Sequence, residues 1–220
     1  MTLSGPELSP RSGHPPKQLV LILHGYGADG EDLIGLGQHW AELFPDALFF
    51  APNAPTRCAQ NPFGYEWFPI DFDHMVQSVA QGVPMAASAV LEGLRDVWSR
   101  TGLGPAQTFL VGFSQGAMMA LHVGLSLPEP PLGIVSFSGA LVPPPGFGAE
   151  KPGRPSVCLI HGDLDQVVDP RLTEDAAVQL QAAGYEVSVH VSHGMAHGIA
   201  PDGLDFATGF MRGCLGAATA

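Results

Sequence analysis

Basic residues are scarce in this chain. Only 9 Lys and Arg stand against 21 Asp and Glu, which gives a formal net charge of −12 at pH 7. No cluster of Lys or Arg reverses this sign locally. Because nucleic acids and anionic lipid surfaces attract positive charge, the composition argues against binding to either.

Cysteine is also rare, and its positions argue against the usual cysteine-based sites. Cys58, Cys158 and Cys214 are an odd number, lie far apart and include no C-x-x-C pair. Disulfide frameworks and cysteine-based zinc sites are typically built from closely spaced pairs. We therefore expect three reduced thiols in a cytoplasmic protein.

Long apolar runs are missing as well. Residues 1–17 are polar and rich in proline, without the charged start and apolar centre of a signal peptide, and no segment approaches the length of a membrane span. We expect a flexible N-terminal tail over residues 1–17 and a single domain over residues 18–220, with no membrane insertion. The sequence leaves open whether the protein forms a homodimer.

Apolar residues, glycine and proline are abundant instead. Hydrophobic residues make up 45% of the chain, with 28 Gly and 21 Pro, which suits short buried strands joined by many turns. Six short apolar runs predict such strands: 18–23, 47–51, 108–111, 133–137, 157–160 and 187–191. The clearest helical period spans residues 84–100, where Pro84 fits the first turn. This alternation predicts an α/β fold with a mostly parallel central sheet and helices on both faces.

Reactive side chains follow four of these runs directly. His24, Ser114, the segment "HGDLD" and the segment "SHGMAH" each come just after a predicted strand, so they should meet at one edge of the sheet. Ser114 lies in a G-x-S-x-G pattern, which suits a sharp strand-to-helix turn that exposes the hydroxyl. A serine nucleophile needs a base and an acid that orients the base. Candidates follow in the order typical of α/β-hydrolases: the carboxylates Asp163, Asp165 and Asp169, then the imidazoles His190, His193 and His197.

Five motifs in order make the chain resemble a known family. "LILHGYGADGEDL", "APNAP", "GFSQGAMMAL", "HGDLDQVV" and "GMAH" are similar to motifs of the carboxylesterase and acyl-protein thioesterase branch of the α/β-hydrolases, also called the phospholipase/carboxylesterase family. The resemblance implies the α/β-hydrolase fold, with Ser114 as nucleophile, Asp165 as acid and His197 as base. It also implies an oxyanion hole made by the backbone N–H groups of Tyr26 and Gln115.

The chain departs from the family pattern at two positions. Tyr26 stands where the family is expected to have leucine, which leaves the role of the backbone amide intact. Asp169 stands between Val168 and Pro170, whereas the family usually places proline directly after the two aliphatic residues. Asp169 is therefore a second candidate for the acid, although an Asp before a helix is also an ordinary cap.

Two other sites are suggested by local patterns. Gly25, Gly27 and Gly30 form G-x-G-x-x-G after a strand, but the second strand lacks the acid that a dinucleotide ribose requires. His193 and His197 have the spacing of a zinc pair, but "HGMAH" lacks the glutamate of H-E-x-x-H. We expect neither metal nor cofactor.

Aromatic residues gather in the segment 61–72. Tyr65, Trp67 and Phe68 are candidates for a substrate-binding wall, and packing of the segment onto the sheet is an equally good interpretation. Met118 and Met119 are expected in the core rather than in a pocket. Since residues 53–83 are the only sizeable insertion, we expect no large cap domain.

The expected function is that of a serine carboxylesterase acting through an acyl-enzyme. The partner would be a small-molecule ester with a small to medium acyl group, and thioesters remain open. The alternatives are a lysophospholipase or cofactor-free perhydrolase on the same fold, or a binding module without catalysis.

Overall fold

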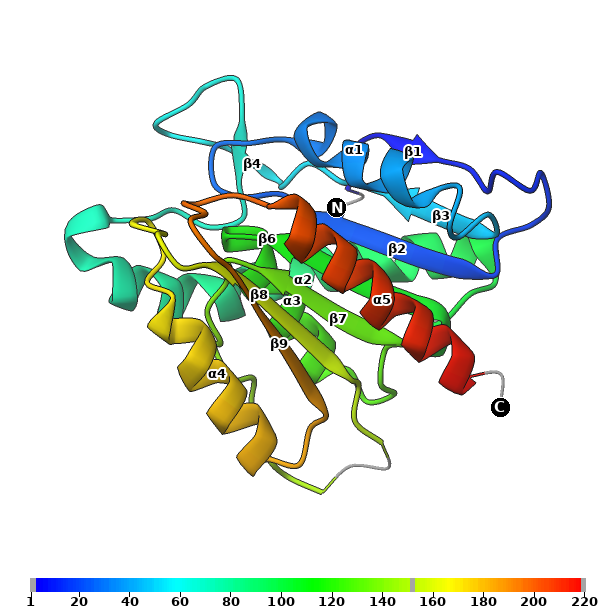
Figure 1. Cartoon of the computed structure of the whole chain (residues 1–220). Coiled ribbons are helices and arrows are strands. Elements are labelled where there is room, and N and C mark those ends of the chain that lie inside the picture. Colours follow the sequence, from blue (N-terminus) through cyan, green and yellow to red (C-terminus); the bar gives the residue numbers. More distant parts are fainter. Residues whose placement is uncertain (1–2, 151–152, 219–220) are drawn as a thin grey trace.

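The computed structural model describes residues 3–150 and 153–218 (Figure 1). A seven-stranded sheet has the order β1-β3-β2-β6-β7-β8-β9, in which β1 is antiparallel to β3 and all other neighbours are parallel. Its strands are β1 (Glu7–Leu8), β2 (Gln18–Leu23), β3 (Ala47–Phe50), β6 (Thr108–Phe113), β7 (Gly133–Phe137), β8 (Val157–Gly162) and β9 (Val187–Ser192). A separate hairpin is formed by β4 (Thr56–Arg57) and β5 (Tyr65–Glu66).

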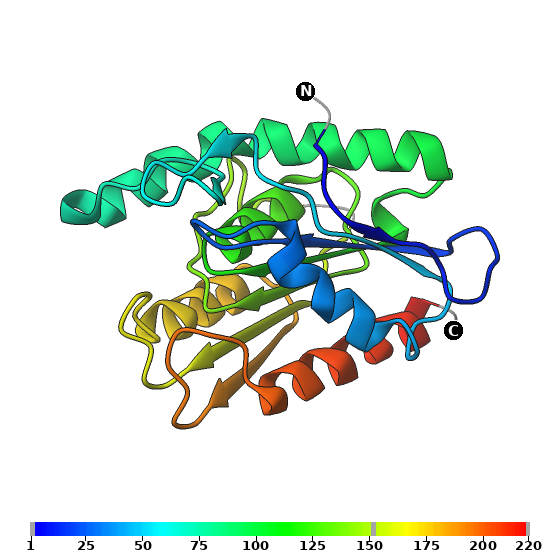
Figure 2. The same cartoon turned by 90° about the horizontal axis from the view of Figure 1, so that it is seen from above.

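Helices cover both faces of the sheet. They are α1 (Gly30–Trp40), α2 (Met75–Thr101), α3 (Gln115–Ser126), α4 (Arg171–Ala182) and α5 (Pro201–Ala218), with short 3-10 turns η1 (Phe72–His74) and η2 (Pro105–Gln107). Residues of α2, α3 and α4 belong to one hydrophobic core, and residues of α1 and α5 belong to the other. Figure 2 shows α2 on one side of the sheet and α1 and α5 on the other.

The apolar runs in the sequence reflect burial on both faces. Along β2, Leu19, Leu21 and Leu23 enter the core below α2 and α3, while Val20 and Ile22 enter the core below α1 and α5. Parallel strands between two helical layers need apolar residues at every position. The α/β-hydrolase fold with a mostly parallel sheet is confirmed, and each of the six predicted strands is present.

The N-terminal segment differs from the expected flexible tail. Residues 1 and 2 lie outside the described residues, but residues 3–8 lie against the domain: β1 pairs with β3, and Leu3 is buried in the core beside α2. Two paired residues and one buried leucine are too short a pattern for hydrophobic periodicity to reveal.

Helix α2 begins earlier than predicted. It starts at Met75, so Pro84 lies inside the helix rather than in its first turn. Pro84 is exposed, as is Ala80, whose carbonyl loses its helical donor because proline has no N–H. Because this face of the helix is open to solvent, the unpaired carbonyl is not trapped in the core, and the helix continues through the proline.

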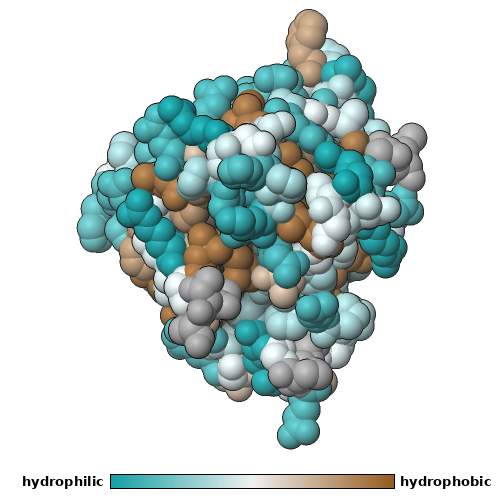
Figure 3. All heavy atoms as spheres, turned by 90° about the vertical axis from the view of Figure 1, so that its right-hand side faces the viewer, coloured by the Kyte–Doolittle hydropathy of each residue, from teal (hydrophilic) through white to brown (hydrophobic). Residues whose placement is uncertain are grey.

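The insertion expected between the second and third predicted strands is small. Residues 53–83 contain the β4–β5 hairpin, η1 and the first turns of α2, and they form no separate cap domain. The carboxyl ends of β2, β6, β8 and β9 lie together at one edge of the sheet. Figure 3 shows the side of the molecule opposite to this edge, where hydrophilic side chains are mixed with smaller apolar areas. No helix in the described part of the chain has the length and apolar character needed to cross a membrane.

Candidate active site

Ser114 lies in a strained turn between β6 and α3. Its φ is 54° and its ψ is −118°, a region that costs a non-glycine residue roughly 1–3 kcal/mol. Flanking glycines make the turn sterically feasible: a Cβ on Gly112 would lie 2.2 Å from the carbonyl oxygen of Gly116, and one on Gly116 would lie 2.0 Å from that of Leu23. The G-x-S-x-G spacing is therefore required by the close approach of α3 to β2 and β6.

A hydrogen-bonded relay starts at this serine. Ser114 Oγ lies 3.0 Å from His197 Nε2, and His197 Nδ1 lies 2.6 Å from Asp165 Oδ2. Since a carboxylate accepts, Nδ1 carries the proton and Nε2 is free to accept the serine proton. The Asp165 side chain is fully buried and that of His197 is 18% exposed, so the relay reaches solvent only at its catalytic end.

Asp165 is held in its ionised form. Its Oδ1 accepts hydrogen bonds from the N–H groups of Val167 at 2.8 Å and Val168 at 2.9 Å. Burial alone would raise the pKa of Asp165, but the hydrogen bonds from His197, Val168 and Val167 outweigh it and place the pKa below its ordinary value.

A second histidine contacts the same carboxylate. His161 Nε2 lies 3.1 Å from Asp165 Oδ2 and 3.0 Å from the carbonyl oxygen of Val168, and both are acceptors. Nε2 must therefore be protonated, and Nδ1 accepts from the Thr173 hydroxyl at 2.6 Å. The contact of His161 with Asp165 was not predicted from the sequence.

The rival carboxylates point elsewhere. Asp163 Oδ2 lies 2.9 Å from Nδ1 of the exposed His193, and this hydrogen bond lowers the pKa of Asp163. Asp169 pairs with Arg171, whose guanidinium lies 2.5 Å away and lowers the pKa of Asp169 to about 2. Of the three candidates in this loop, the structure brings Asp165 to His197.

The expected oxyanion donors lie beside Ser114. Gln115 is the first residue of α3, so its N–H has no acceptor within the helix. The loop that carries Tyr26 passes close to Ser114 at the preceding residue, where a Cβ on Gly25 would lie 3.3 Å from Ser114 Cβ. His24 steadies this loop: its Nε2 accepts from the N–H of Ala54 at 3.0 Å and its Nδ1 donates to the carbonyl of Gly25 at 2.7 Å.

The side chain of Gln115 ties the turn to the aromatic segment, a role the sequence did not indicate. Gln115 Oε1 accepts from the N–H of Trp67, and Gln115 Nε2 donates to the carbonyl of Phe68, both at 2.8 Å. The Trp67 indole donates to the carbonyl of His24 at 2.9 Å. One clamp therefore holds the aromatic segment, the oxyanion loop and the start of α3 together.

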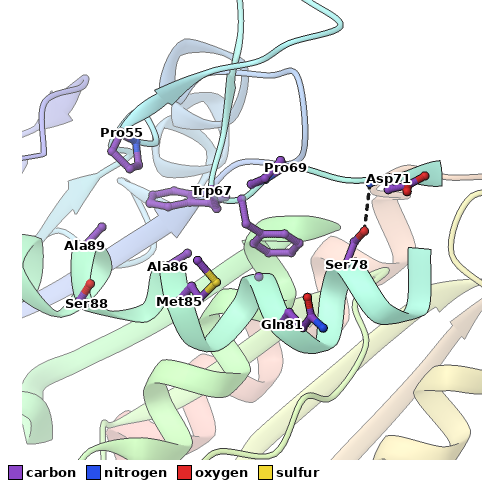
Figure 4. Close-up of a pocket in the computed structure, with 12 residues that line it drawn as sticks. Pro55, Trp67, Pro69, Asp71, Ser78, Gln81, Met85, Ala86, Ser88 and Ala89 are labelled. Carbon is purple, nitrogen blue, oxygen red and sulfur yellow. Dashed lines mark hydrogen bonds between the residues drawn. The ribbon is translucent and has the colours of Figure 1, made fainter. Parts of the chain in front are cut away.

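The three aromatic candidates have different surroundings. Tyr65 stacks under Arg57, whose guanidinium lies 4.1 Å from the ring centroid. Trp67 and Phe68 are buried and line a groove of about 530 Å³ between their segment and α2 (Figure 4). A substrate-binding role for the aromatic residues stays a prediction.

An apolar groove begins one turn beyond the serine. It has a volume of about 430 Å³ between α2, α3 and the loops after β7 and β8. Met118, whose N–H donates to the Ser114 carbonyl at 3.2 Å, lines it, as does Val168 beside Asp165. Met118 belongs to the hydrophobic core, as expected, and it also forms a wall of this groove, whereas Met119 is fully buried.

The His193 and His197 pair is not arranged as a metal site. His193 faces Asp163 on the surface, and His197 faces Ser114 and Asp165. Over residues 3–150 and 153–218, no group of three or more His, Cys, Asp or Glu could hold a metal ion.

Known proteins share this arrangement of sequence and fold. The family model described as phospholipase/carboxylesterase matches residues 10–215. The chain belongs to the phospholipase/carboxylesterase family. It is 29% identical to the esterase YpfH of Escherichia coli over 90% of this chain and 83% of that protein. It is 30% identical to acyl-protein thioesterase 1 of Saccharomyces cerevisiae over 90% and 93% of the two chains.

A solved structure is closer still to this phospholipase/carboxylesterase family member. The crystal structure of esterase PE8 is 52% identical, covers 97% of this chain and 100% of its own, and superposes with a TM-score of 0.93. The predicted family is therefore confirmed.

Proposed function

We propose that this member of the family is a serine hydrolase of carboxylic esters that works through an acyl-enzyme. The observation that carries the proposal is the relay from Ser114 through His197 to Asp165, with distances of 3.0 Å and 2.6 Å. Geometry of this kind activates a serine hydroxyl that is otherwise a weak nucleophile.

The steps follow from the protonation states of the relay. His197 Nε2 accepts the Ser114 proton as Ser114 Oγ bonds to the substrate carbonyl carbon. The tetrahedral intermediate then expels its alcohol, which takes the proton from His197, and the acyl group stays on Ser114. Water repeats the sequence and releases the acid, while Asp165 stabilises the imidazolium in both halves.

The backbone N–H groups of Tyr26 and Gln115 would receive the developing oxyanion. Such donors contribute about 3 kcal/mol each to stabilisation of the transition state. The strained φ of Ser114 supports this role, since it starts α3 at the next residue and leaves the N–H of Gln115 unpaired within the helix.

The acyl group would lie in the groove lined by Met118 and Val168. Its volume of about 430 Å³ and apolar walls suit small to medium acyl chains. The likeness to acyl-protein thioesterase 1 of yeast favours thioesters as a second substrate class. The three free cysteines suit a reducing compartment, and we place the activity in the cytoplasm.

Covalent labelling tests the proposal directly. A fluorophosphonate probe should label the native protein and should not label Ser114→Ala, which should lose about 10⁶ in kcat. Hydrolysis of p-nitrophenyl esters of increasing chain length, with a thioester in parallel, would define the acyl preference. A folded native protein that neither reacts with the probe nor hydrolyses any ester would instead support a binding module.

A further inference from the structure

A second groove lies on the other side of His197. It has a volume of about 410 Å³, and its walls come from α1, from the end of β6 and from the loop before α5. Its lining includes His197 itself, and the other side chains are mostly apolar: Leu33, Leu36, Phe113 and Ile199. The Phe113 ring packs against the His197 ring, with 4.8 Å between centroids.

The two grooves lie over opposite faces of the sheet. Leu33, Leu36 and Phe113 pack against the core below α1 and α5. Met118 and Val168, which line the acyl groove, belong to the core below α2, α3 and α4. Ser114 follows β6 between these two layers, so an ester bound at the serine has an apolar groove on each side.

Proton transfer decides which half of an ester enters which groove. His197 Nε2 takes the serine proton and must deliver it to the leaving oxygen, so the leaving group has to lie on the His197 side. His197 lines the groove beside α1 and does not line the acyl groove. The alcohol half therefore belongs beside α1.

The charge at this groove is negative. Asp32 is its only charged lining residue, and Glu31 and Asp29 lie in the same turn of chain. The Asp32 carboxylate also accepts the N–H of Asp29 at 3.1 Å, which fixes its position at the start of α1. A fixed carboxylate attracts cations and repels anions.

We propose that the groove lined by Leu33, Leu36, Phe113 and His197 binds the alcohol half of the substrate and selects compact apolar alcohols, uncharged or cationic rather than anionic. This assignment rests on the proposed ester hydrolysis and adds the leaving-group specificity. Acyl specificity would be set separately, on the other face of the sheet.

Gly35 offers a way to fill this groove without disturbing the fold. It lines the groove on α1, and a Cβ placed there would meet no other atom within 4 Å. Gly35→Leu should therefore add bulk to the groove and strengthen the helix slightly. Gly209→Leu is the matched control, because Gly209 is an exposed glycine of α5 with equally open space.

Esters that share one acyl group separate the two halves of the reaction. For Gly35→Leu we expect kcat/KM for benzyl butyrate to fall at least tenfold relative to methyl butyrate, with no such change in Gly209→Leu. Deacylation of the butyryl-enzyme, measured after a p-nitrophenyl butyrate burst, should stay within twofold, because the alcohol has already left. A changed acyl-length profile, or an equal loss for both butyrates, would overturn the assignment.

Charge selectivity is tested at Asp32. Asp32→Asn keeps an oxygen for the helix cap, and it should lower the kcat/KM ratio of butyrylcholine to its uncharged isostere 3,3-dimethylbutyl butyrate about fivefold. Glu31→Gln, next to the groove but not lining it, should change the ratio less. An unchanged ratio in Asp32→Asn, or an equal fall in Glu31→Gln, would refute the role of Asp32. If the native protein hydrolyses none of these esters, the proposed function itself fails.

Discussion

Replacing Asp165 by asparagine should disable catalysis through the tautomer of His197. In the native relay, Asp165 Oδ1 accepts two backbone N–H groups and Oδ2 accepts the proton on His197 Nδ1. An asparagine has only one oxygen for these two places. The outcome depends on which place that oxygen takes.

The energies of the two orientations decide this question. If the amide oxygen faces His197, the NH2 group faces the N–H groups of Val167 and Val168, and both lose their acceptor; Val168 is buried, and an unpaired buried donor costs about 1–3 kcal/mol. If the oxygen serves those N–H groups, the NH2 group faces His197 and His161, and His161 keeps its bond to the Val168 carbonyl at 3.0 Å. The second orientation costs less and should dominate.

In that orientation His197 has the wrong tautomer. Its Nδ1 must accept from the amide, so the proton moves to Nε2, which then cannot accept from Ser114 Oγ. By analogy with other serine triads, we expect a loss of about 10⁴ in kcat, equivalent to about 5 kcal/mol, with little change in KM.

Asp163→Asn and Asp169→Asn are the matched controls. Both carboxylates lie on the surface in pairs with His193 and Arg171, and exposed ion pairs of this kind contribute little to stability. Their kcat should stay within about twofold of the native value, with folding checked by circular dichroism and Tm. If Asp165→Asn keeps kcat within tenfold while Asp169→Asn loses it, the acid is Asp169 and the reasoning is refuted.

Further predictions concern the stability of the protein and the independence of its activity from metal ions. Thr173→Val removes the hydroxyl that donates to His161 Nδ1, so the free energy of unfolding should fall by about 1–3 kcal/mol in denaturant titrations; an unchanged value would contradict a contribution of this hydrogen bond to stability. Gly116→Ala places a Cβ 2.0 Å from the Leu23 carbonyl oxygen, and should cost at least about 3 kcal/mol or prevent folding, as solubility and Tm would show. The pKa of Asp165 is lower in the folded protein than in the unfolded chain. Its contribution to stability should therefore be complete above the ordinary carboxyl pKa and should disappear as the pH falls through the lower folded pKa. The difference in Tm between the native protein and Asp165→Asn should narrow in acid, and a constant difference would argue against this. EDTA should leave ester hydrolysis unchanged, and a loss restored by zinc would contradict the cofactor-free mechanism.

The sequence predicted the elements that long, regular patterns define. The apolar run 18–23 gave β2 its full length because a strand buried on both faces needs apolar residues at each position. Strand β1 pairs through only two residues, and its burial comes from β3, some forty residues further along the chain, so no local pattern reveals it. Pro84 misplaced the start of α2 because an exposed proline can be tolerated inside a long helix.

The site shows the same division between local and distant information. Ser114 and His197 could be proposed from motifs, since each motif is a short loop next to its own strand. The clamp made by Gln115 could not, because its partners Trp67 and Phe68 lie 48 and 47 residues away. Likewise, "HGDLD" does not reveal which of its carboxylates turns inward, and the contact of His161 with Asp165 emerges only from the folded loop.

Gln115 also explains why the aromatic segment matters even if it never touches substrate. Its side-chain amide bonds to Trp67 and Phe68, and the Trp67 indole donates to the carbonyl of His24, which lies in the loop of the second proposed oxyanion donor. The loops that carry both proposed donors are therefore hydrogen-bonded to one segment, which lies beside α2. Electrostatic stabilisation depends on donors that need not reorganise during the reaction. If these two N–H groups receive the oxyanion, as we propose, the insertion over residues 53–83 would help to hold them in place, and its hydrogen bonds support this role more directly than that of a substrate-binding wall.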